Sequence, residues 1–254
     1  METPDLEPLR QAMQAAPENP DTRQALLQAL VAAEVWEEAE EVGEALLRTA
    51  SPPAAVHALM GTVYGKRDRW DDAVQQCRIA FELQPDDPLL LYNLGTLLAQ
   101  QGDIDAAVTH LKNATTQRET WAEAHYNLGA VLLRQKCYTE AVEAFERAIG
   151  LRDVYPEANF NSGNAHAMLG LGADGGLDYY EVDCAINAYK LAIQQRPGYT
   201  AALYNLGMLY GRMTSSEGLR VWDQYLEAAQ DRPEEETWRM RAQEYQRDLQ
   251  DRLR

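Results

Sequence analysis

Glycine and alanine recur along the chain at a fixed spacing. Five glycines are separated by 34, 34, 34 and 44 residues: Gly61, Gly95, Gly129, Gly163 and Gly207. The same period and the same ten-residue interruption recur in four alanines: Ala73, Ala107, Ala141 and Ala185. Because two independent markers follow one period, the sequence predicts an array of structural repeats. Such repeats bury their apolar faces only by stacking on one another.

Within each repeat the small residues lie on a helical stripe. In the best-defined unit the apolar positions 4, 7, 8 and 11 follow the i, i+3, i+4, i+7 pattern of one α-helical face. Positions 7 and 8 are Leu128 and Gly129, and a second helix follows with Ala141 and Phe145. Small residues on this stripe let two helices approach closely, while large ones fill the space beside them. The pattern therefore predicts helical hairpins that stack.

These residues resemble the tetratricopeptide repeat (TPR) family, whose 34-residue unit is two antiparallel helices with small residues at positions 8, 20 and 27. The best unit has Gly129, Ala141 and Ala148 in these slots. The resemblance covers about nine-tenths of the chain and implies an all-α, right-handed superhelical solenoid of about six units. The expected segments are an N-terminal cap (1–19), units at 20–53, 54–87, 88–121, 122–155, 156–199 and 200–233, and a C-terminal cap helix (234–254). The units at 20–53 and 200–233 diverge most.

An asparagine occupies position 6 in four units, each time directly after an aromatic residue. The pairs are Tyr92 and Asn93, Tyr126 and Asn127, Phe160 and Asn161, and Tyr204 and Asn205. At 100° per residue, position 6 points away from the packing stripe. In TPR proteins that face lines a concave groove, so the resemblance implies a ladder of asparagines there. An amide side chain donates and accepts, and so pairs with the backbone of an extended peptide. The alternative is that these asparagines serve helix packing or solvation only.

Other polar residues share the predicted groove face. Asn164 is one, and three cations at position 13 are Lys66, Arg134 and Arg212. These cations indicate a partner with an acidic or C-terminal carboxylate group, although a helix C-terminus also favours cations. The clamp that some TPR co-chaperones use for chaperone tails needs lysine at position 5, where this chain has aromatic or small residues. We therefore expect a different protein partner.

The unit at 156–199 departs from the pattern. Three polar residues occupy slots that are apolar elsewhere: Asn159, Ser162 and His166. The turn between its helices is ten residues longer, near 171–184. Insertions in solenoids map to one face, often a binding face. We therefore expect a second docking site at Asp178, Tyr179 and Tyr180. The alternatives are a hinge, or a neutral insertion in which the three polar residues hydrogen-bond each other.

Charge and cysteine content narrow the function further. A net charge of −17 and a pI of about 4.6 repel phosphate backbones and anionic lipids, so we expect no nucleic-acid partner and no membrane insertion. The three cysteines have neither the pairing of a disulfide framework nor the spacing of a zinc site. Together with the absence of an apolar leader, this pattern is typical of a cytoplasmic protein.

Catalytic signatures are missing from the sequence. It contains no H-E-x-x-H, G-x-S-x-G, phosphate-loop or dinucleotide motif. We therefore expect no enzyme activity, no cofactor and no metal. The expected function is that of an adaptor or scaffold that binds an extended peptide or partner segment in the groove. Two alternatives remain open: a self-assembling scaffold, homo-oligomeric through its end or groove faces, and an accessory subunit of a larger enzyme complex.

Overall fold

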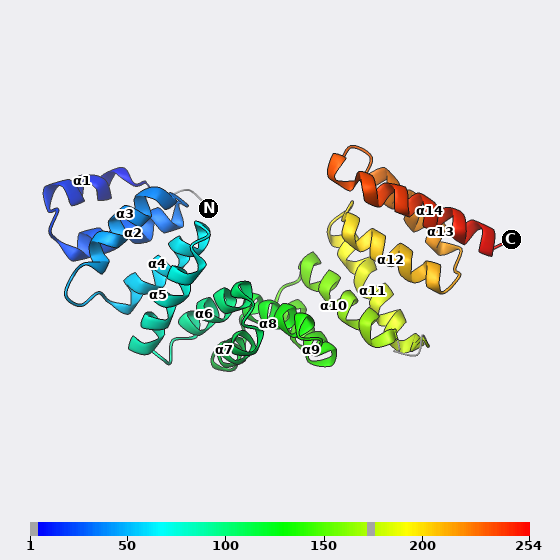
Figure 1. Cartoon of the computed structure of the whole chain (residues 1–254), viewed down its shortest axis with the longest axis horizontal. Coiled ribbons are helices and arrows are strands. Elements are labelled where there is room, and N and C mark those ends of the chain that lie inside the picture. The colour runs from blue at the N-terminus through cyan, green and yellow to red at the C-terminus, as the bar shows by residue number, and fades with distance from the viewer. Residues whose placement is uncertain (1–4, 172–175) are drawn as a thin grey trace. The chain divides into compact units, whose positions relative to one another are not determined.

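The computed structural model describes residues 5–171 and 176–254. Their regular structure is α-helical, apart from one short 3-10 helix and one isolated bridge between Leu171 and Leu177. The helices pack in sequential pairs, which confirms the all-α repeat fold expected from the sequence (Figure 1). The chain divides into two compact units, Met1–Glu119 and Thr120–Arg254.

Unit 1 contains three helical pairs preceded by one short helix. Its helices are α1 (Glu7–Ala15), α2 (Pro20–Ala32), α3 (Trp36–Leu47), α4 (Ala54–Lys66), α5 (Trp70–Leu83), α6 (Pro88–Gln101) and α7 (Ile104–Gln117). The pairs are α2 with α3, α4 with α5, and α6 with α7. The first helices of successive pairs, α2, α4 and α6, also touch in that order. Their outer sides therefore form one continuous face of the unit.

Unit 2 repeats this organisation. Its helices are α8 (Ala122–Arg134), α9 (Tyr138–Leu151), α10 (Pro156–Gly170), α11 (Tyr179–Gln195), α12 (Thr200–Arg212), α13 (Glu217–Ala228), the 3-10 helix η1 (Pro233–Glu235) and α14 (Glu236–Arg252). The pairs are α8 with α9, α10 with α11, and α12 with α13, and α14 packs against both α12 and α13. The division of the chain into repeat units, as opposed to helices, stays a prediction.

Close approach at glycine explains how each pair holds together. A Cβ atom on Gly129 of α8 would lie 2.7 Å from the Phe145 ring of α9. One on Gly207 of α12 would lie 2.8 Å from the Trp222 ring of α13. The four periodic alanines of the second helices are fully buried: Ala73, Ala107, Ala141 and Ala185. This geometry confirms that the periodic small residues set the distance between paired helices.

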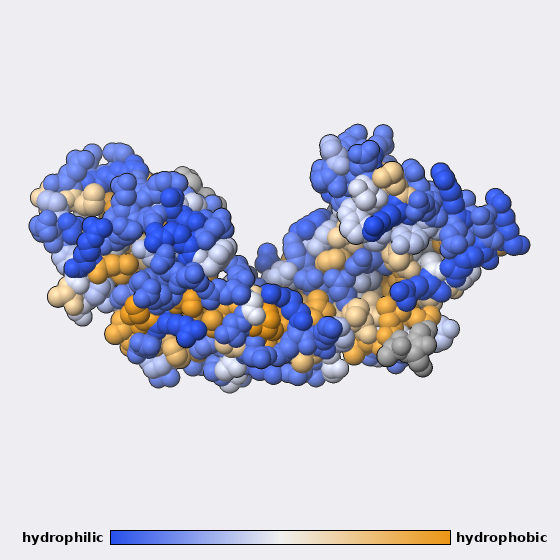
Figure 2. All heavy atoms as spheres, in the orientation of Figure 1, coloured by the Kyte–Doolittle hydropathy of each residue, from blue (hydrophilic) through white to orange (hydrophobic). Residues whose placement is uncertain are grey.

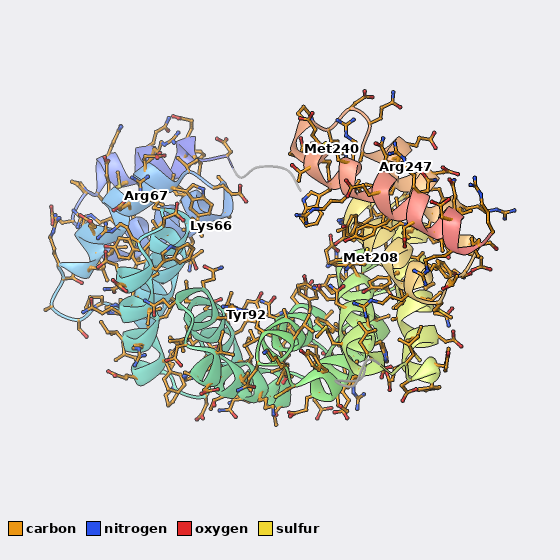
Figure 3. All side chains as sticks on the ribbon, turned by 45° about the vertical axis from the view of Figure 1, so that its right-hand side comes forward. Lys66, Arg67, Tyr92, Met208, Met240 and Arg247 are labelled. Atoms are coloured by element: carbon orange, nitrogen blue, oxygen red, sulfur yellow. The ribbon has the colours of Figure 1, made fainter. Side chains whose placement is uncertain are left out.

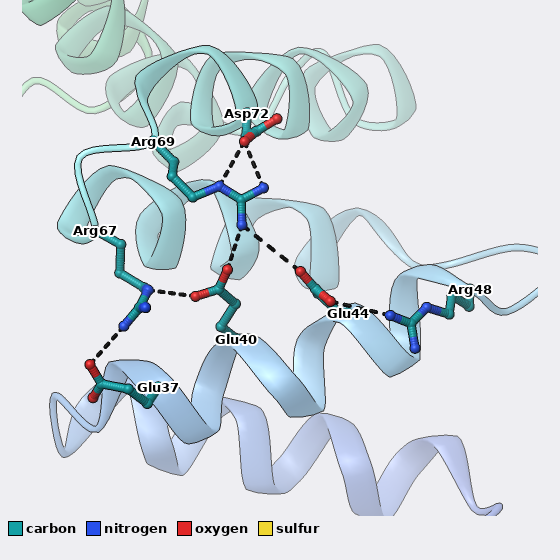
Figure 4. Close-up of polar contacts among 7 residues, drawn as sticks. All are labelled: Glu37, Glu40, Glu44, Arg48, Arg67, Arg69 and Asp72. Atoms are coloured by element: carbon teal, nitrogen blue, oxygen red, sulfur yellow. Dashed lines mark hydrogen bonds and ion pairs between the residues drawn. The ribbon is translucent and has the colours of Figure 1, made fainter.

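Ion pairs fasten α3 to the turn between α4 and α5 (Figure 4). Glu40 of α3 pairs with both Arg67 and Arg69, at 2.5 Å in each case. Arg67 also reaches Glu37 at 2.7 Å, and Arg69 reaches Asp72 at 2.7 Å. Isolated surface pairs contribute about 1 kcal/mol or less. The Glu40 carboxylate, shared between two guanidinium groups, joins α3 to the turn of the next pair at two points.

The predicted insertion is partly helical. α11 begins at Tyr179, inside the 171–184 segment that the sequence predicts as an enlarged turn. Asp178 starts the helix because its carboxylate accepts a hydrogen bond from the backbone N–H of Tyr180, at 3.0 Å. The expectation of a loop reaching residue 184 is therefore wrong. The insertion lengthens both the connection, from Gly170 to Tyr179, and the helix, since α11 has 17 residues where α9 has 14. Residues 172–175 of this segment lie outside the described residues.

The polar core residues of α10 find partners on α11. The Asn159 side-chain amide donates to Gln195 Oε1, at 3.1 Å, and His166 Nδ1 lies 2.7 Å from Glu181 Oε2. Asn159 is 3% exposed, so its hydrogen bond replaces the water that burial removes. Asn159 and His166 thus bond across the helix pair. The alternative in which the polar residues of α10 bond each other does not describe these two.

Hydrophilic residues cover most of the surface at both chain ends. On the face shown in Figure 2, the first three helices of unit 1 and α14 of unit 2 are mainly hydrophilic. α14 contributes Ala242 and Leu249 to the core that it shares with α12 and α13. Three other large apolar residues of α14 are 40–56% exposed: Trp238, Met240 and Tyr245. Trp238 and Tyr245 lie on the same side of the helix as Ala242 and Leu249, whereas Met240 projects from the opposite side.

Candidate functional site

A cavity of about 370 Å³ lies between α4 and α6 in unit 1. Tyr92 and Asn93 of α6 line it, together with Lys66 from the end of α4. Figure 3 shows Lys66 and Tyr92 on the same face of the unit. Trp70 and Gln100 complete its polar and aromatic rim. The structure thus brings three predicted groove residues to one place, which we call the α4–α6 cavity.

A second cavity, of about 440 Å³, lies between α10 and α12 in unit 2. Four predicted residues line it: Asn164, Tyr204, Asn205 and Arg212. Met208, which Figure 3 labels on α12, adds apolar surface. Met168 and Tyr189 also contribute. We call this the α10–α12 cavity.

The two cavities use the same repeat positions. Position 5 is tyrosine and position 6 is asparagine in both, on α6 and on α12. Position 9 is Thr96 in unit 1 and Met208 in unit 2, and position 13 is Gln100 and Arg212. The shared tyrosine and asparagine therefore give each unit an aromatic wall with an adjacent amide. Each cavity also has one cation, Lys66 or Arg212, and Met208 makes the unit 2 cavity more apolar at position 9.

A chain of hydrogen bonds runs through the polar wall of unit 2. Asn161 donates to the Tyr126 hydroxyl at 3.1 Å, which links α10 to α8. Asn164 donates to Asn161 Oδ1 at 3.3 Å. The Asn164 carbonyl oxygen then accepts from the Tyr189 hydroxyl at 2.9 Å and from Asn205 Nδ2 at 2.8 Å. The asparagines of this unit therefore tie helices together as well as facing the groove.

Burial raises the pKa of two tyrosines in this hydrogen-bond chain. It is the main cause that raises the pKa of Tyr189, which is 2% exposed. Burial also raises the pKa of Tyr126, with a smaller contribution from the nearby Glu157 carboxylate. Both hydroxyls therefore keep their protons to a higher pH than an exposed tyrosine does. Tyr189 can then act as a hydrogen-bond donor to Asn164.

The remaining groove residues of the prediction lie outside these two cavities. Tyr126, Asn127 and Arg134 are on α8, and Phe160 and Asn161 are on α10. The Tyr126 ring packs on Tyr155 with centroids 5.1 Å apart, and the Phe160 ring packs on Tyr199 at the same distance. The aromatic residues of position 5 thus cover the joint to the next helical pair, with one side left half-exposed.

Sequence reasoning missed several residues that line the cavities. Thr96 and Met208 occupy position 9, which falls on the same helical face as positions 5 and 6. That periodicity was sufficient to find them. Trp70 and Tyr189 come instead from the second helices, α5 and α11. Their contribution depends on how a hairpin closes, so a pattern read along the first helices does not reveal it.

The residues of the predicted second docking site lie at the start of α11. The Tyr179 and Tyr180 side chains are 65% and 73% exposed, at the first turn of α11. Asp178 is engaged as the cap of that helix. The two tyrosines therefore face solvent at the start of α11, whereas the Asp178 side chain caps the helix.

The described residues offer neither a cluster of metal ligands nor a membrane-spanning helix. Residues 5–171 and 176–254 contain no group of three or more histidine, cysteine, aspartate or glutamate side chains able to hold a metal ion. Within these ranges, every helix is too short or too polar to cross a lipid bilayer.

Comparison with known proteins agrees with this architecture. The family model described as tetratricopeptide repeat matches residues 58–120, 92–156 and 138–183. A crystal structure of MamA is similar at 26% identity and a TM-score of 0.61, covering 68% of this chain and 96% of that one. MamA 41-end from Desulfovibrio magneticus RS-1 has 20% identity and a TM-score of 0.64, with 73% and 99% covered.

YrrB, described as a TPR protein with an unusual peptide-binding site, has 20% identity and a TM-score of 0.64. The match covers 79% of this chain and 98% of YrrB. No curated protein sequence matches the chain. At these identities the likeness to YrrB and to the Desulfovibrio protein is one of fold.

Proposed function

Because the chain is a member of the tetratricopeptide repeat family, we propose that it is a non-catalytic adaptor that holds an extended segment of a partner protein against its first helices. TPR repeats generally mediate protein–protein interactions. The proposal assigns the binding to the α4–α6 cavity and the α10–α12 cavity, with the asparagines of position 6 as the residues that contact the partner backbone.

One observation carries this proposal. In each unit, a tyrosine and an asparagine of the same repeat positions line a cavity between first helices. The two cavity volumes, about 370 and 440 Å³, fall within the range of ligand-binding pockets in proteins. The tyrosine ring supplies contact area at low entropy cost, and the amide pairs with peptide groups of any sequence.

The asparagines keep capacity for such a partner. Asn205 spends one N–H on Asn164, which leaves its own carbonyl oxygen as an acceptor. In the part of the chain that the structure describes, the Asn93 side chain makes no hydrogen bond to another residue. Both are half-buried beside fully buried leucines, Leu94 and Leu206. A partner backbone laid over them would replace water with directed hydrogen bonds.

The test is combined substitution of Asn93→Ala, Asn127→Ala and Asn205→Ala, followed by affinity capture from the cell of origin. Each lost amide–backbone bond removes about 1 kcal/mol, so recovery of bound protein should fall at least about tenfold. Quantitative mass spectrometry measures the recovery. Circular dichroism at the capture temperature checks that helicity is kept, because Asn205 also bonds within the fold.

The matched control is Asn113→Ala with Asn187→Ala. These asparagines are exposed on second helices, α7 and α11, and line neither cavity. The control should recover its partners as the native chain does. Equal recovery by the triple variant and the control would refute the role given to the asparagines.

The cations at position 13 favour a partner segment that has an acidic group. Lys66 and Arg212 are exposed at the rims of the two cavities. Each places a positive group beside the asparagine and tyrosine, where an acidic residue or a C-terminal carboxylate of the partner would pair with it. The partner segment is therefore proposed to have an acidic group near one of these rims.

A second candidate function is self-assembly through the C-terminal end. The observation that favours it is Met240, a large apolar residue of α14 that is 56% exposed and projects from the side of the helix away from the core residues Ala242 and Leu249. An exposed apolar side chain of this size adds contact area when two copies meet.

A further inference from the structure

A third cavity, of about 260 Å³, lies between α12, η1 and α14 in unit 2. Three aromatic rings line it, from Tyr204, Tyr225 and Trp238. The Tyr204 and Trp238 rings meet edge to face with centroids 5.2 Å apart, and Tyr204 meets Tyr225 at 5.5 Å. Trp238 is 44% exposed, so the cavity opens to solvent on its side. We call it the C-terminal pocket.

A carboxylate forms the polar part of this pocket. Glu235 accepts a hydrogen bond from Thr200 Oγ1 at 2.8 Å and one from the Tyr225 hydroxyl at 3.0 Å. Both donors are neutral, and among the described residues Glu235 forms no ion pair. A carboxylate has about four acceptor sites. The two hydroxyls therefore hold Glu235 in place without neutralising it, and two sites remain open.

Two of the chain's own cations, Arg239 and Arg241, lie near the pocket without lining it. Arg239 donates to the Gln230 backbone carbonyl at 2.8 Å. The Arg241 guanidinium lies 5.2 Å from the centroid of the Trp238 ring. Neither arginine lines the pocket. The second contact shows that this indole attracts a cation in the native fold.

We infer that the C-terminal pocket binds a lysine or arginine side chain of the partner segment. Aromatic rings around a fixed carboxylate are the surroundings that favour a cationic head with an apolar stem. An acidic side chain would be repelled by Glu235. An uncharged apolar one would remove water from the carboxylate and give nothing in return.

Continuity with the proposed groove identifies the source of that side chain. Tyr204 and Asn205 line both the α10–α12 cavity and the C-terminal pocket. A segment whose backbone pairs with Asn205 would thus place a neighbouring side chain against Glu235 and Trp238. The net charge of −17 also favours a basic approach. This inference rests on the proposed function, and it adds a basic residue to the expected partner.

The test uses small probes, because one side chain is the predicted ligand. The full chain, labelled with ¹⁵N, is titrated with N-acetyl-lysine methylamide and the indole N–H signal of Trp238 is followed by NMR. N-acetyl-norleucine and N-acetyl-glutamate methylamides serve as the neutral and acidic probes. We expect a saturable shift with the lysine probe and at least about fivefold weaker binding of the other two. Equal or tighter binding of either would overturn the inference.

Glu235→Gln isolates the charge. It keeps the size of the side chain and an oxygen that accepts from Tyr225, and it should weaken the lysine probe about tenfold. The matched control is Glu234→Gln, which removes the same charge from an exposed neighbour on η1 that does not line the pocket. The control should change binding less than about twofold, as expected for a distant screened charge. Equal effects of both variants would reduce the result to general electrostatics and reject the pocket.

Failure here and failure of the proposed function give different results. If the lysine probe leaves Trp238 unmoved while the asparagine variant still loses its partners, only the pocket assignment is wrong. If the probe binds and the asparagine variant captures normally, the pocket stands and the groove proposal falls.

Discussion

Asn164 is the residue on which the polar wall of unit 2 depends. It forms hydrogen bonds with Asn161 of its own helix α10, with Tyr189 of α11 and with Asn205 of α12. The Tyr189 hydroxyl is buried, so its hydrogen bond has no water to replace it. The Asn164 side chain thus supplies a hydrogen-bond partner to all three of these side chains.

We expect Asn164→Ala to lower the free energy of unfolding by about 1–3 kcal/mol, because it leaves a buried donor without an acceptor. Urea unfolding followed by tryptophan fluorescence measures it. Asn93→Ala is the comparison, since that asparagine faces a cavity without bonding to another described residue. Its cost should stay below about 0.5 kcal/mol. Similar costs for both variants would contradict the network.

Cys77 gives a second prediction at this scale. It is 1% exposed and packs where Gly61 brings α4 and α5 together, and burial raises its pKa to about 12. At pH 8 iodoacetamide should modify Cys137, which is half-exposed, and leave Cys77 unmodified until the chain unfolds. Peptide mapping by mass spectrometry distinguishes the two. Labelling of both at one rate would mean that the α4–α5 pair opens readily.

The same pKa predicts an alkaline loss of stability. The unfolded thiol ionises near pH 8.5, whereas the folded thiol keeps its proton to about pH 12. The folded state therefore binds more protons in this window, and stability falls as the pH rises, by up to about 1.4 kcal/mol per pH unit. Cys77→Ala should remove this contribution from the pH dependence of urea unfolding, at the cost of a small cavity. An unchanged alkaline slope would reject the assignment.

Between paired helices, one turn residue repeats with the period of the sequence. Glu34, Asp68, Gly102 and Lys136 all have φ between +58° and +93°, and each lies 34 residues after the one before. Only one of these residues is glycine, the type that adopts this left-handed conformation without strain. The short turn therefore imposes the conformation on whatever residue stands there.

Gly102→Ala tests this turn. A Cβ at Gly102 meets nothing within 4 Å, so any penalty comes from its φ of +93° alone. We expect a loss of about 1–2 kcal/mol in the free energy of unfolding. Gly150→Ala is the matched control: its Cβ also meets nothing, but it lies within α9 without a positive φ, and alanine should add about 0.5–1 kcal/mol there. The same sign of change at both positions would contradict the argument.

The helical pairs were predictable because their cause is local. The contact of Gly129 with Phe145 recurs one and two repeats earlier, where Gly95 meets Leu111 and Gly61 meets Cys77 at the same spacing along the chain. The spacing alone therefore indicates the contact. The α4–α6 cavity was predictable for the same reason, through Tyr92 and Asn93. The end of the α10–α11 turn was not, because a single cap, Asp178, decided where α11 begins.

The C-terminal pocket was beyond the sequence for a different reason. Glu235 and Trp238 come from a segment outside the repeat, and their position depends on the 3-10 turn that joins α13 to α14. No periodic neighbour exists from which to infer their direction. The Asn164 hydrogen bonds were likewise hidden, since they join residues 25 and 41 positions apart. A contact that occurs only once in the chain leaves no periodic pattern in the sequence from which to predict it.

At the scale of the whole molecule, charge opposes self-association. Each chain has a net charge of −17, so two copies repel one another at long range. The distance over which this charge repulsion acts, the Debye length, falls from about 30 Å at 0.01 M salt to about 3 Å at 1 M salt. If the exposed side of α14 around Met240 joins two copies, assembly should therefore appear as salt is raised. Light scattering coupled to size exclusion should give 28.6 kDa at low salt and a larger mass at high salt.

Met240→Ser separates assembly through α14 from general loss of repulsion. Met240 is 56% exposed, so its replacement leaves the core intact while removing apolar contact area. It should restore the 28.6 kDa mass at high salt, whereas Met168→Ser, at a methionine of α10 that is 47% exposed, should not. A mass that stays monomeric at every salt and protein concentration would overturn the self-assembly alternative. A dimer already present at low salt would show instead that local contacts exceed the repulsion of the net charge.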